Sequence, residues 1–177
     1  MKKMRTSKDE WFLDEAERCA RQGTCLRRVY GAIVVDSEET IITTGYVGAP
    51  RKTRDCLRRG KCWRKAHRIP SGSNYEKCRS VHAETNALLQ AGKLARGSTL
   101  YLVGLDAETG KLIDAHPCAM CARLILNAQI SMVVMRRHDG SIIKREPSYL
   151  NALWDGEVFD NMSVDWSHLC FASQISE

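Results

Sequence analysis

The sequence predicts an α/β protein, a three-layer α/β/α sandwich around a central mixed sheet. Three observations lead to this fold class. An amphipathic helix pattern opens the chain over residues 8–21. Two strand-like runs follow, with only a short acidic turn between them, which is typical of a hairpin. Beyond the hairpin, helical and strand-like segments alternate, so the later strands are expected to run parallel to each other.

The first helix and the hairpin come from local patterns. Trp11, Phe12 and Cys19 lie at partial helical spacing, which indicates one apolar helix face. The run VYGAIVV over 29–35 predicts a buried strand, and 40–46 predicts a second strand beside it. Because the strands of a hairpin are antiparallel, the whole sheet is expected to be mixed.

The second half of the fold consists of four alternating segments. The expected ranges, in chain order, are a helix over 82–90, a strand over 99–105, a helix over 117–127 and a strand over 130–135. Ser80 is the expected N-cap of the helix over 82–90. Pro117 favours the first turn of the helix over 117–127. After residue 136 the pattern favours neither state.

We expect a single domain over residues 1–177, because 177 residues is an ordinary domain length. Its net charge of +6 is unevenly distributed. Segment 51–68 has nine Lys or Arg and one acid, and it lies in a Cys-rich basic insertion at about 51–78. The C-terminal tail at about 155–177 has five acids and no Lys or Arg. The basic segment indicates a solvated loop, a phosphate-bearing ligand, a nucleic-acid backbone or a partner's acidic tail.

Composition excludes several classes of protein. Hydrophobic residues make up 44% and charged residues 27%, which excludes long disorder, collagen and coiled coil. No apolar run approaches the roughly 20 residues of a membrane-spanning helix, so no membrane partner is expected. The N-terminal segment lacks the apolar core of a secretory signal, so we expect a cytoplasmic protein. In that compartment, eight cysteines favour metal binding or catalysis over disulfides.

Two motifs carry the chemistry: HAE, with His82 and Glu84, and PCAMC, with Cys118 and Cys121. Each opens an expected helix, and the two cysteines share one helix face. One imidazole nitrogen and two thiolates supply three ligands of a tetrahedral zinc ion and leave the fourth position open, as in catalytic sites. Glu84 then has the role of proton carrier, provided that it and His82 both lie at the helix start. Alone, the Cys pair is equally compatible with a redox pair or half a structural site.

The order H-x-E, then P-C-x-x-C, resembles the signature of the zinc-dependent cytidine deaminase family. The similarity is closer to its deoxycytidylate (dCMP) deaminase branch and covers about residues 11–135. The stretches that carry it are TCLRRVYGAIVV at 24–35, TGYVGAP at 44–50, CRSVHAETNAL at 78–88 and PCAMCARLILNAQI at 117–130.

This resemblance implies a reaction: hydrolysis of dCMP to dUMP and ammonia, with one catalytic zinc on the three ligands named above. It implies that Glu84 carries the proton and that groups near Ala83 and Pro117 hold the pyrimidine. It also implies a nucleotide substrate, a homo-oligomer, often a hexamer, and dCTP or dTTP as effectors.

The chain departs from the family pattern at two candidate substrate-binding positions. Val47 replaces an Asn that often contacts the nucleotide sugar, so either another group makes that contact or the substrate preference differs. Arg136 begins a basic stretch where many members have an aromatic residue. An arginine there is suited to paired hydrogen bonds with a 5′-phosphate; a solvated strand end is the alternative.

Four more cysteines flank or lie within the basic insertion: Cys25, Cys56, Cys62 and Cys78. The insertion has few apolar residues, so a closed structural zinc site is expected to tie its ends to the first strand. Some dCMP deaminases have a second, structural zinc, and Cys25 and Cys56 resemble its ligands. His67 is an alternative to Cys62. Free thiols are the competing interpretation, which predicts one zinc ion per chain.

Two other functions stay open. The basic segment also suits a deaminase of another cytosine nucleotide or of tRNA adenosine, and a panel of substrates distinguishes these. A non-catalytic, zinc-stapled nucleic-acid binder needs only the zinc ligands, so the presence of Glu84 argues against it. We therefore do not expect nucleic acid as the main partner.

Overall fold

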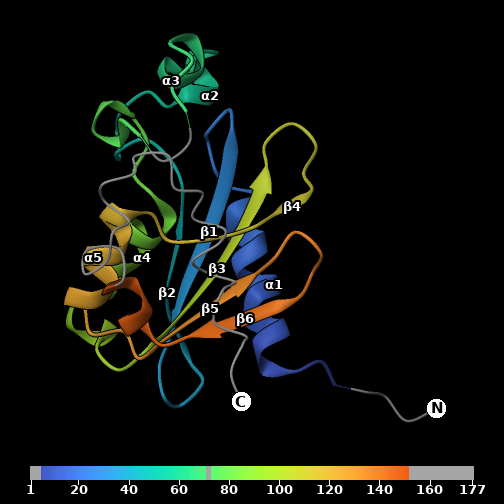
Figure 1. Cartoon of the computed structure of the whole chain (residues 1–177), viewed down its shortest axis with the longest axis vertical. Coiled ribbons are helices and arrows are strands. Elements are labelled where there is room, and N and C mark those ends of the chain that lie inside the picture. Colours follow the sequence, from blue (N-terminus) through green and yellow to red (C-terminus); the bar gives the residue numbers. More distant parts are fainter. Residues whose placement is uncertain (1–4, 71–72, 152–177) are drawn as a thin grey trace.

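The computed structural model describes residues 5–70 and 73–151, and the expected acidic tail at about 155–177 lies outside the described residues (Figure 1). The strands are β1 (Arg28–Val35), β2 (Ile41–Tyr46), β3 (Thr99–Asp106), β4 (Leu112–Ile113), β5 (Met132–Arg136) and β6 (Ile142–Arg145). They form one mixed sheet with the order β2-β1-β3-β5-β6, and β4 also pairs with β3. In the described part, no helix is both long and apolar enough to cross a membrane.

Strand directions agree with the pattern of the sequence. β1 pairs antiparallel with β2, as expected for a hairpin, and antiparallel with β3 on its other side. β3 and β5, which the helix α5 (Ala119–Asn127) connects, are parallel, with Leu100 opposite Val133. β6 then returns antiparallel to β5. The predicted mixed sheet is therefore confirmed.

Helices cover both faces of this sheet (Figure 1). α1 (Lys8–Ala20) packs on one face, while α4 (Ala83–Ala91) and α5 (Ala119–Asn127) pack on the other. Along β1, Ile33 belongs to the core beneath α1 and its neighbour Ala32 to the core beneath α4 and α5, because strand side chains alternate between faces. The three-layer prediction is confirmed.

A glycine brings the start of α4 directly onto the sheet. A Cβ atom at Gly45 of β2 would lie 2.3 Å from the carbonyl oxygen of Ala83, a distance that no side chain tolerates. The first turn of α4 can lie this close to β2 only because position 45 has no side chain. The close contact of Gly45 with the helix backbone thereby fixes the distance between the start of α4 and the sheet.

Some expected boundaries are wrong. His82, not Ser80, is the N-cap of α4, and no side-chain hydrogen bond caps that helix. Pro117 lies just before Cys118, the N-cap of α5, rather than in the first turn. The sequence patterns also missed β4, β6 and the 3-10 helices η2 (Gly92–Ala95) and η3 (Pro147–Asn151).

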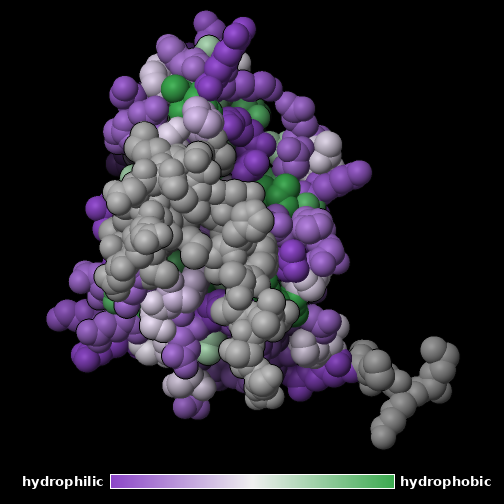
Figure 2. Space-filling model, in the orientation of Figure 1, coloured by the Kyte–Doolittle hydropathy of each residue, from purple (hydrophilic) through white to green (hydrophobic). Residues whose placement is uncertain are grey.

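The basic insertion forms a lobe at one end of the sheet, at the top of Figure 1. Its short helices are α2 (Cys56–Arg59), α3 (Trp63–Ala66) and the 3-10 helix η1 (Tyr75–Lys77). Asp55 caps α2 by accepting a hydrogen bond from the Arg58 amide at 2.7 Å. The lobe is mostly hydrophilic on the face seen in Figure 2, with isolated hydrophobic side chains. Helices of one turn show no periodicity, so the sequence pattern could not reveal them.

Candidate metal and active site

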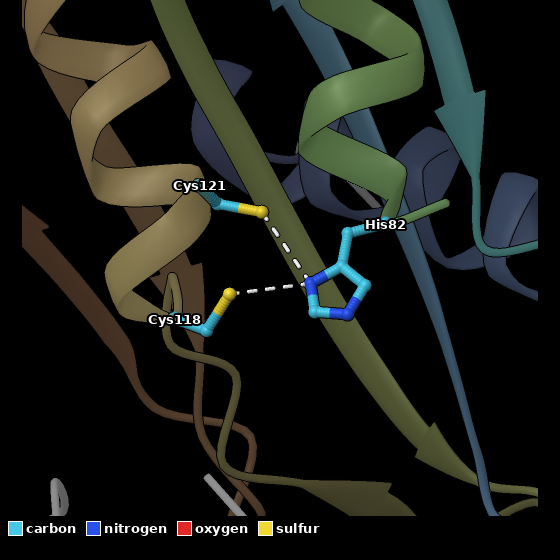
Figure 3. A group of neighbouring side chains, drawn as sticks. All are labelled: His82, Cys118 and Cys121. Carbon is cyan, nitrogen blue, oxygen red and sulfur yellow. Dashed lines mark hydrogen bonds between the residues drawn. The ribbon is translucent and has the colours of Figure 1, made fainter. Parts of the chain in front are cut away.

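His82, Cys118 and Cys121 converge on one point (Figure 3). The Nδ1 atom of His82 lies 3.3 Å from the Sγ atom of Cys118 and 3.4 Å from that of Cys121. Within 5–70 and 73–151, this is the only group of three or more His, Cys, Asp or Glu side chains whose ligand atoms all lie within 4.8 Å of one another. One imidazole and two cysteine sulfurs are ligands that zinc prefers, and three protein ligands leave a position open.

The ends of two helices bring these ligands together. His82 is the N-cap of α4 and Cys118 the N-cap of α5, and Cys121 lies in the first turn of α5. A helix N-terminus has partial positive charge and favours thiolate over thiol. The hydrogen bond from Cys121, and then that with His82, outweigh burial and lower the pKa of Cys118 to about 4. Sequence reasoning predicted this geometry, and the donor set fits zinc.

His82 and Cys121 hold protons more tightly than usual. Burial disfavours the imidazolium of His82, but the hydrogen bond with Cys118 and the charge of Glu84 outweigh it and raise the His82 pKa. The hydrogen bond to Cys118, together with burial, raises the pKa of Cys121. A metal cation has to displace these protons to bind, because its ligands must be deprotonated.

Glu84 lies in the first turn of α4 and is 4% exposed. It lines a cavity of about 100 Å³ together with His82 and Cys118. Burial raises the pKa of Glu84, and the nearby charge of His82 opposes this rise only in part. A carboxyl group with a raised pKa, beside a metal site and facing a small cavity, is suited to taking up and releasing a proton.

The predicted substrate-binding residues divide into two groups. Val47 and Ala83 line the cavity, while Pro117 does not line it but immediately precedes the ligand Cys118. The structure does not bring Arg136 to this site. Its guanidinium is 2.8 Å from Asp14 and 3.3 Å from Glu17, both on helix α1 across the sheet. The reason is that β5 directs this side chain toward the face covered by α1.

Sequence reasoning missed several residues that line the cavity: Arg27, Arg28, Tyr30, Arg64, Tyr75 and His116. Burial raises the pKa of Tyr30 to about 12, so its hydroxyl keeps its proton. Burial lowers the pKa of His116 to about 4, so its ring is neutral at pH 7. The CLRR run at residues 25–28 could have indicated Arg27 and Arg28, and the position next to the PCAMC motif could have indicated His116.

Cys25, Cys56, Cys62 and Cys78 line one cavity of about 1430 Å³ between the insertion and the body, and His67 lines it too. Burial raises the pKa of Cys56, and the negative charges that the other three cysteines carry as thiolates add to this rise. Among the described residues, however, no three of these five side chains have their ligand atoms within 4.8 Å of one another. The Nδ1 atom of His67 is 2.8 Å from the carbonyl oxygen of Trp63.

The chain matches a known protein family over most of its length. Residues 6–137 match the family described as "Cytidine and deoxycytidylate deaminase zinc-binding region". The chain belongs to this family.

Several curated relatives are named deoxycytidylate deaminase. The protein of Schizosaccharomyces pombe is 30% identical over 148 residues, 80% of this chain and 42% of that protein. The protein of Saccharomyces cerevisiae is 34% identical over 135 residues, 74% of this chain and 38% of that protein. The chain thus spans about two fifths of these relatives. The protein of Mycobacterium phage D29 is 34% identical over 132 residues, 71% of this chain and 91% of that protein.

Solved structures support the fold. The dCMP deaminase of cyanophage S-TIM5 in its apo form is 24% identical, with a TM-score of 0.53 over 76% of this chain and 86% of that chain. The same cyanophage enzyme is also known in complex with dCMP and dUMP, at 23% identity and a TM-score of 0.53. These likenesses agree with the mixed sheet and flanking helices described above.

Proposed function

We propose that the protein is a zinc-dependent enzyme that hydrolyses dCMP to dUMP and ammonia. The observation that carries this proposal is the position of Glu84. Its buried carboxyl group lines the same cavity as His82 and Cys118, directly beside the three-residue metal group. Relatives named deoxycytidylate deaminase support the choice of substrate.

His82, Cys118 and Cys121 are the residues that would hold the zinc ion. When bound, zinc supplies a Lewis acid that lowers the pKa of water at its open position. The chain's own contribution is to hold the three ligands on two helix starts. His82 and Cys118 also line the small cavity that Glu84 lines.

Glu84 would move the proton in both halves of the reaction. Its carboxylate accepts a proton from the attacking water and then donates it to the amino nitrogen that leaves C4 of the pyrimidine as ammonia. The raised pKa of Glu84 suits this double role, because a group that titrates nearer to neutral pH both accepts and donates a proton readily. Val47 and Ala83 form part of the wall against which the pyrimidine nucleotide would lie.

We also propose a second, structural zinc ion in the insertion, with ligands chosen from Cys25, Cys56, Cys62, Cys78 and the alternative His67. The support is that all five line one cavity. A metal ion there would draw the four sulfur atoms together and tie the insertion to the start of β1. Homo-oligomeric assembly, regulation by dCTP or dTTP and a cytoplasmic location stay predictions.

The test is a substrate panel on the zinc-loaded protein. Ammonia release and loss of ultraviolet absorbance are followed with dCMP, CMP, dCTP, deoxycytidine, cytosine and an adenosine-containing tRNA stem-loop, and Glu84→Ala is run beside the wild type. Turnover of dCMP that the variant lacks supports the proposal. Turnover of the RNA alone contradicts the proposal and favours an adenosine deaminase. A zinc-loaded wild type that turns over none of these substrates also contradicts it and favours the nucleic-acid binder.

A further inference from the structure

The basic insertion forms part of the active-site cavity. Four of its residues line the cavity beside Glu84: Cys62, Arg64, Tyr75 and Cys78. The insertion is also anchored close by, since Arg27 donates a hydrogen bond to the carbonyl oxygen of Ile69 at 3.2 Å. A segment of basic composition therefore supplies one wall of the space that the substrate would occupy.

Arg64 is an unusual member of this wall. It is only 7% exposed, although arginine is rarely buried without a partner. One of its terminal nitrogens donates to the Pro70 carbonyl oxygen, but its Nε atom is buried and has no hydrogen-bond partner in the described ranges. In the same ranges no carboxylate forms an ion pair with it. A buried, unpaired charge is costly, so the site is built for an anion.

The charge of the whole cavity points the same way. Arg27 and Arg28 line it together with Arg64, whereas Glu84 is the only carboxylate among the described lining residues. Guanidinium groups match phosphate with forked pairs of hydrogen bonds and are the side chains of choice for phosphate recognition. The anion that complements this cavity is therefore a phosphate group.

Tyr75 determines where that phosphate would lie. The guanidinium carbon of Arg64 is 4.4 Å from the centre of the Tyr75 ring, a cation–π contact that restrains the side chain. The same ring meets His82 in a T-shaped contact, with the ring centroids 4.9 Å apart. The Tyr75 ring thus lies between the guanidinium and His82. In a nucleoside 5′-monophosphate, one sugar ring lies between the phosphate and the base in the same way. A phosphate at Arg64 would therefore leave the base near His82.

We propose that Arg64, held by Tyr75, binds the 5′-phosphate of the substrate and determines the preference for a nucleoside monophosphate over a nucleoside. This inference rests on the proposed deaminase activity and assigns its substrate-charge specificity to one residue of the insertion. Arg64 would act in binding rather than in the chemical step, because the proton transfers belong to Glu84, another residue that lines the cavity.

The test compares kinetics on dCMP and deoxycytidine for the wild type, Arg64→Gln and the control Arg59→Gln, which removes an exposed charge from the same insertion. We expect Arg64→Gln to raise the KM for dCMP by roughly 30- to 100-fold, with kcat within a few-fold of wild type. Its kcat/KM for deoxycytidine should stay within about twofold, because no phosphate contact is lost. Arg59→Gln should change neither substrate's constants by more than about twofold.

An unchanged preference for dCMP in an Arg64→Gln protein with wild-type zinc content overturns the inference. If that variant does not fold, Arg64→Lys decides: it keeps the charge but not the forked donors, and an equal loss for both substrates contradicts a phosphate role. The affinities of Glu84→Gln for dUMP and for deoxyuridine, measured by calorimetry, give the same comparison without turnover. A wild type that binds dUMP through Arg64 but deaminates nothing contradicts the proposed function alone.

Discussion

The Nδ1 atom of His82 lies 3.3 Å from the Sγ atom of Cys118, although 36 positions separate the two residues in the sequence. Each is the N-cap of its helix, His82 for α4 and Cys118 for α5. An N-cap side chain is not confined to one helix face, because its backbone is extended rather than helical. This is why Glu84, only two residues beyond His82, can line the same cavity. The group of His82, Glu84 and Cys118 is thus built from two helix starts rather than from helix faces.

Glu84→Gln should abolish deamination without loss of zinc. The amide keeps the size of the side chain but cannot accept and return a proton, so kcat should fall by at least about 1000-fold. Zinc should stay bound, since the group of candidate ligand atoms is His82, Cys118 and Cys121. The measurement is ammonia release together with zinc analysis by mass spectrometry. Glu76→Gln, an exposed carboxylate of η1, is the control and should keep wild-type activity. A Glu84→Gln protein with more than a tenth of wild-type kcat would show that another group moves the proton.

Arg136→Met should reduce stability and leave substrate binding unchanged. The Arg136 side chain is 10% exposed and forms ion pairs with Asp14 and Glu17 of α1. Its removal therefore breaks the ion pairs that link the helix to β5. Both carboxylates are partly solvated, so we expect the free energy of unfolding to fall by about 2 kcal/mol, less than for a fully buried pair. Urea unfolding and the KM for dCMP check this, with Arg96→Met as the exposed control. A raised KM at unchanged stability would return Arg136 to the substrate site.

Sequence patterns predicted the parts of the fold whose signals are local. The hairpin of β1 and β2 and the alternation after it follow from strand and helix periodicity. The grouping of His82, Cys118 and Cys121 follows from the spacing of two short motifs. Arg136 shows the limit: the pattern placed it at a strand end but could not tell toward which face of the sheet its side chain points. Ser80 fits the composition of an N-cap, yet His82 occupies that position although its side chain makes no capping hydrogen bond.

The cavity wall contributed by the insertion lay beyond sequence reasoning for a different reason. Arg64 and Tyr75 belong to one-turn helices within a segment that shows no periodicity. Their positions depend on contacts with distant parts of the chain, such as the hydrogen bond from Arg27 to Ile69 and the ring contact of Tyr75 with His82. A basic composition is compatible with an anionic ligand, but only the folded chain shows which arginines line the cavity.

Cys56→Ser should remove the proposed structural zinc while the catalytic one stays bound. If the four cysteines at the insertion hold zinc, the wild type binds about two ions per chain and the variant about one. The variant should also melt at a lower temperature, because the insertion loses its tie to β1. Zinc analysis and thermal unfolding measure both effects. Cys19→Ser, on α1 and far from the insertion in the sequence, is the control and should keep two ions. A wild type with one zinc ion per chain would support free thiols instead.

Asp114 should stabilise the loop that leads to Cys118, and its contribution should disappear in acid. Its carboxylate accepts hydrogen bonds from the backbone amide and the imidazole of His138, each at 2.9 Å. Burial alone would raise the pKa of Asp114, but these hydrogen bonds and the nearby charges of His138 and Arg137 prevail and lower it. The pKa of such a carboxyl group is lower in the folded than in the unfolded state, where it is near 3.9. The group therefore stabilises the fold at pH values above its unfolded-state pKa. This stabilisation is lost as the pH falls through its folded-state pKa.

Asp114→Asn tests this dependence. The side chain is 34% exposed, so solvent screening limits the expected loss at pH 5 to about 0.5–1 kcal/mol. Between pH 5 and pH 3 the difference between wild type and variant should shrink toward zero, because the wild-type carboxylate becomes protonated. Urea unfolding of both proteins in metal-free form makes the measurement independent of acid release of zinc. Glu38→Gln, an exposed carboxylate in the turn between β1 and β2, should show no such convergence. A difference that stays constant down to pH 3 would mean that the charge of Asp114 does not stabilise the loop.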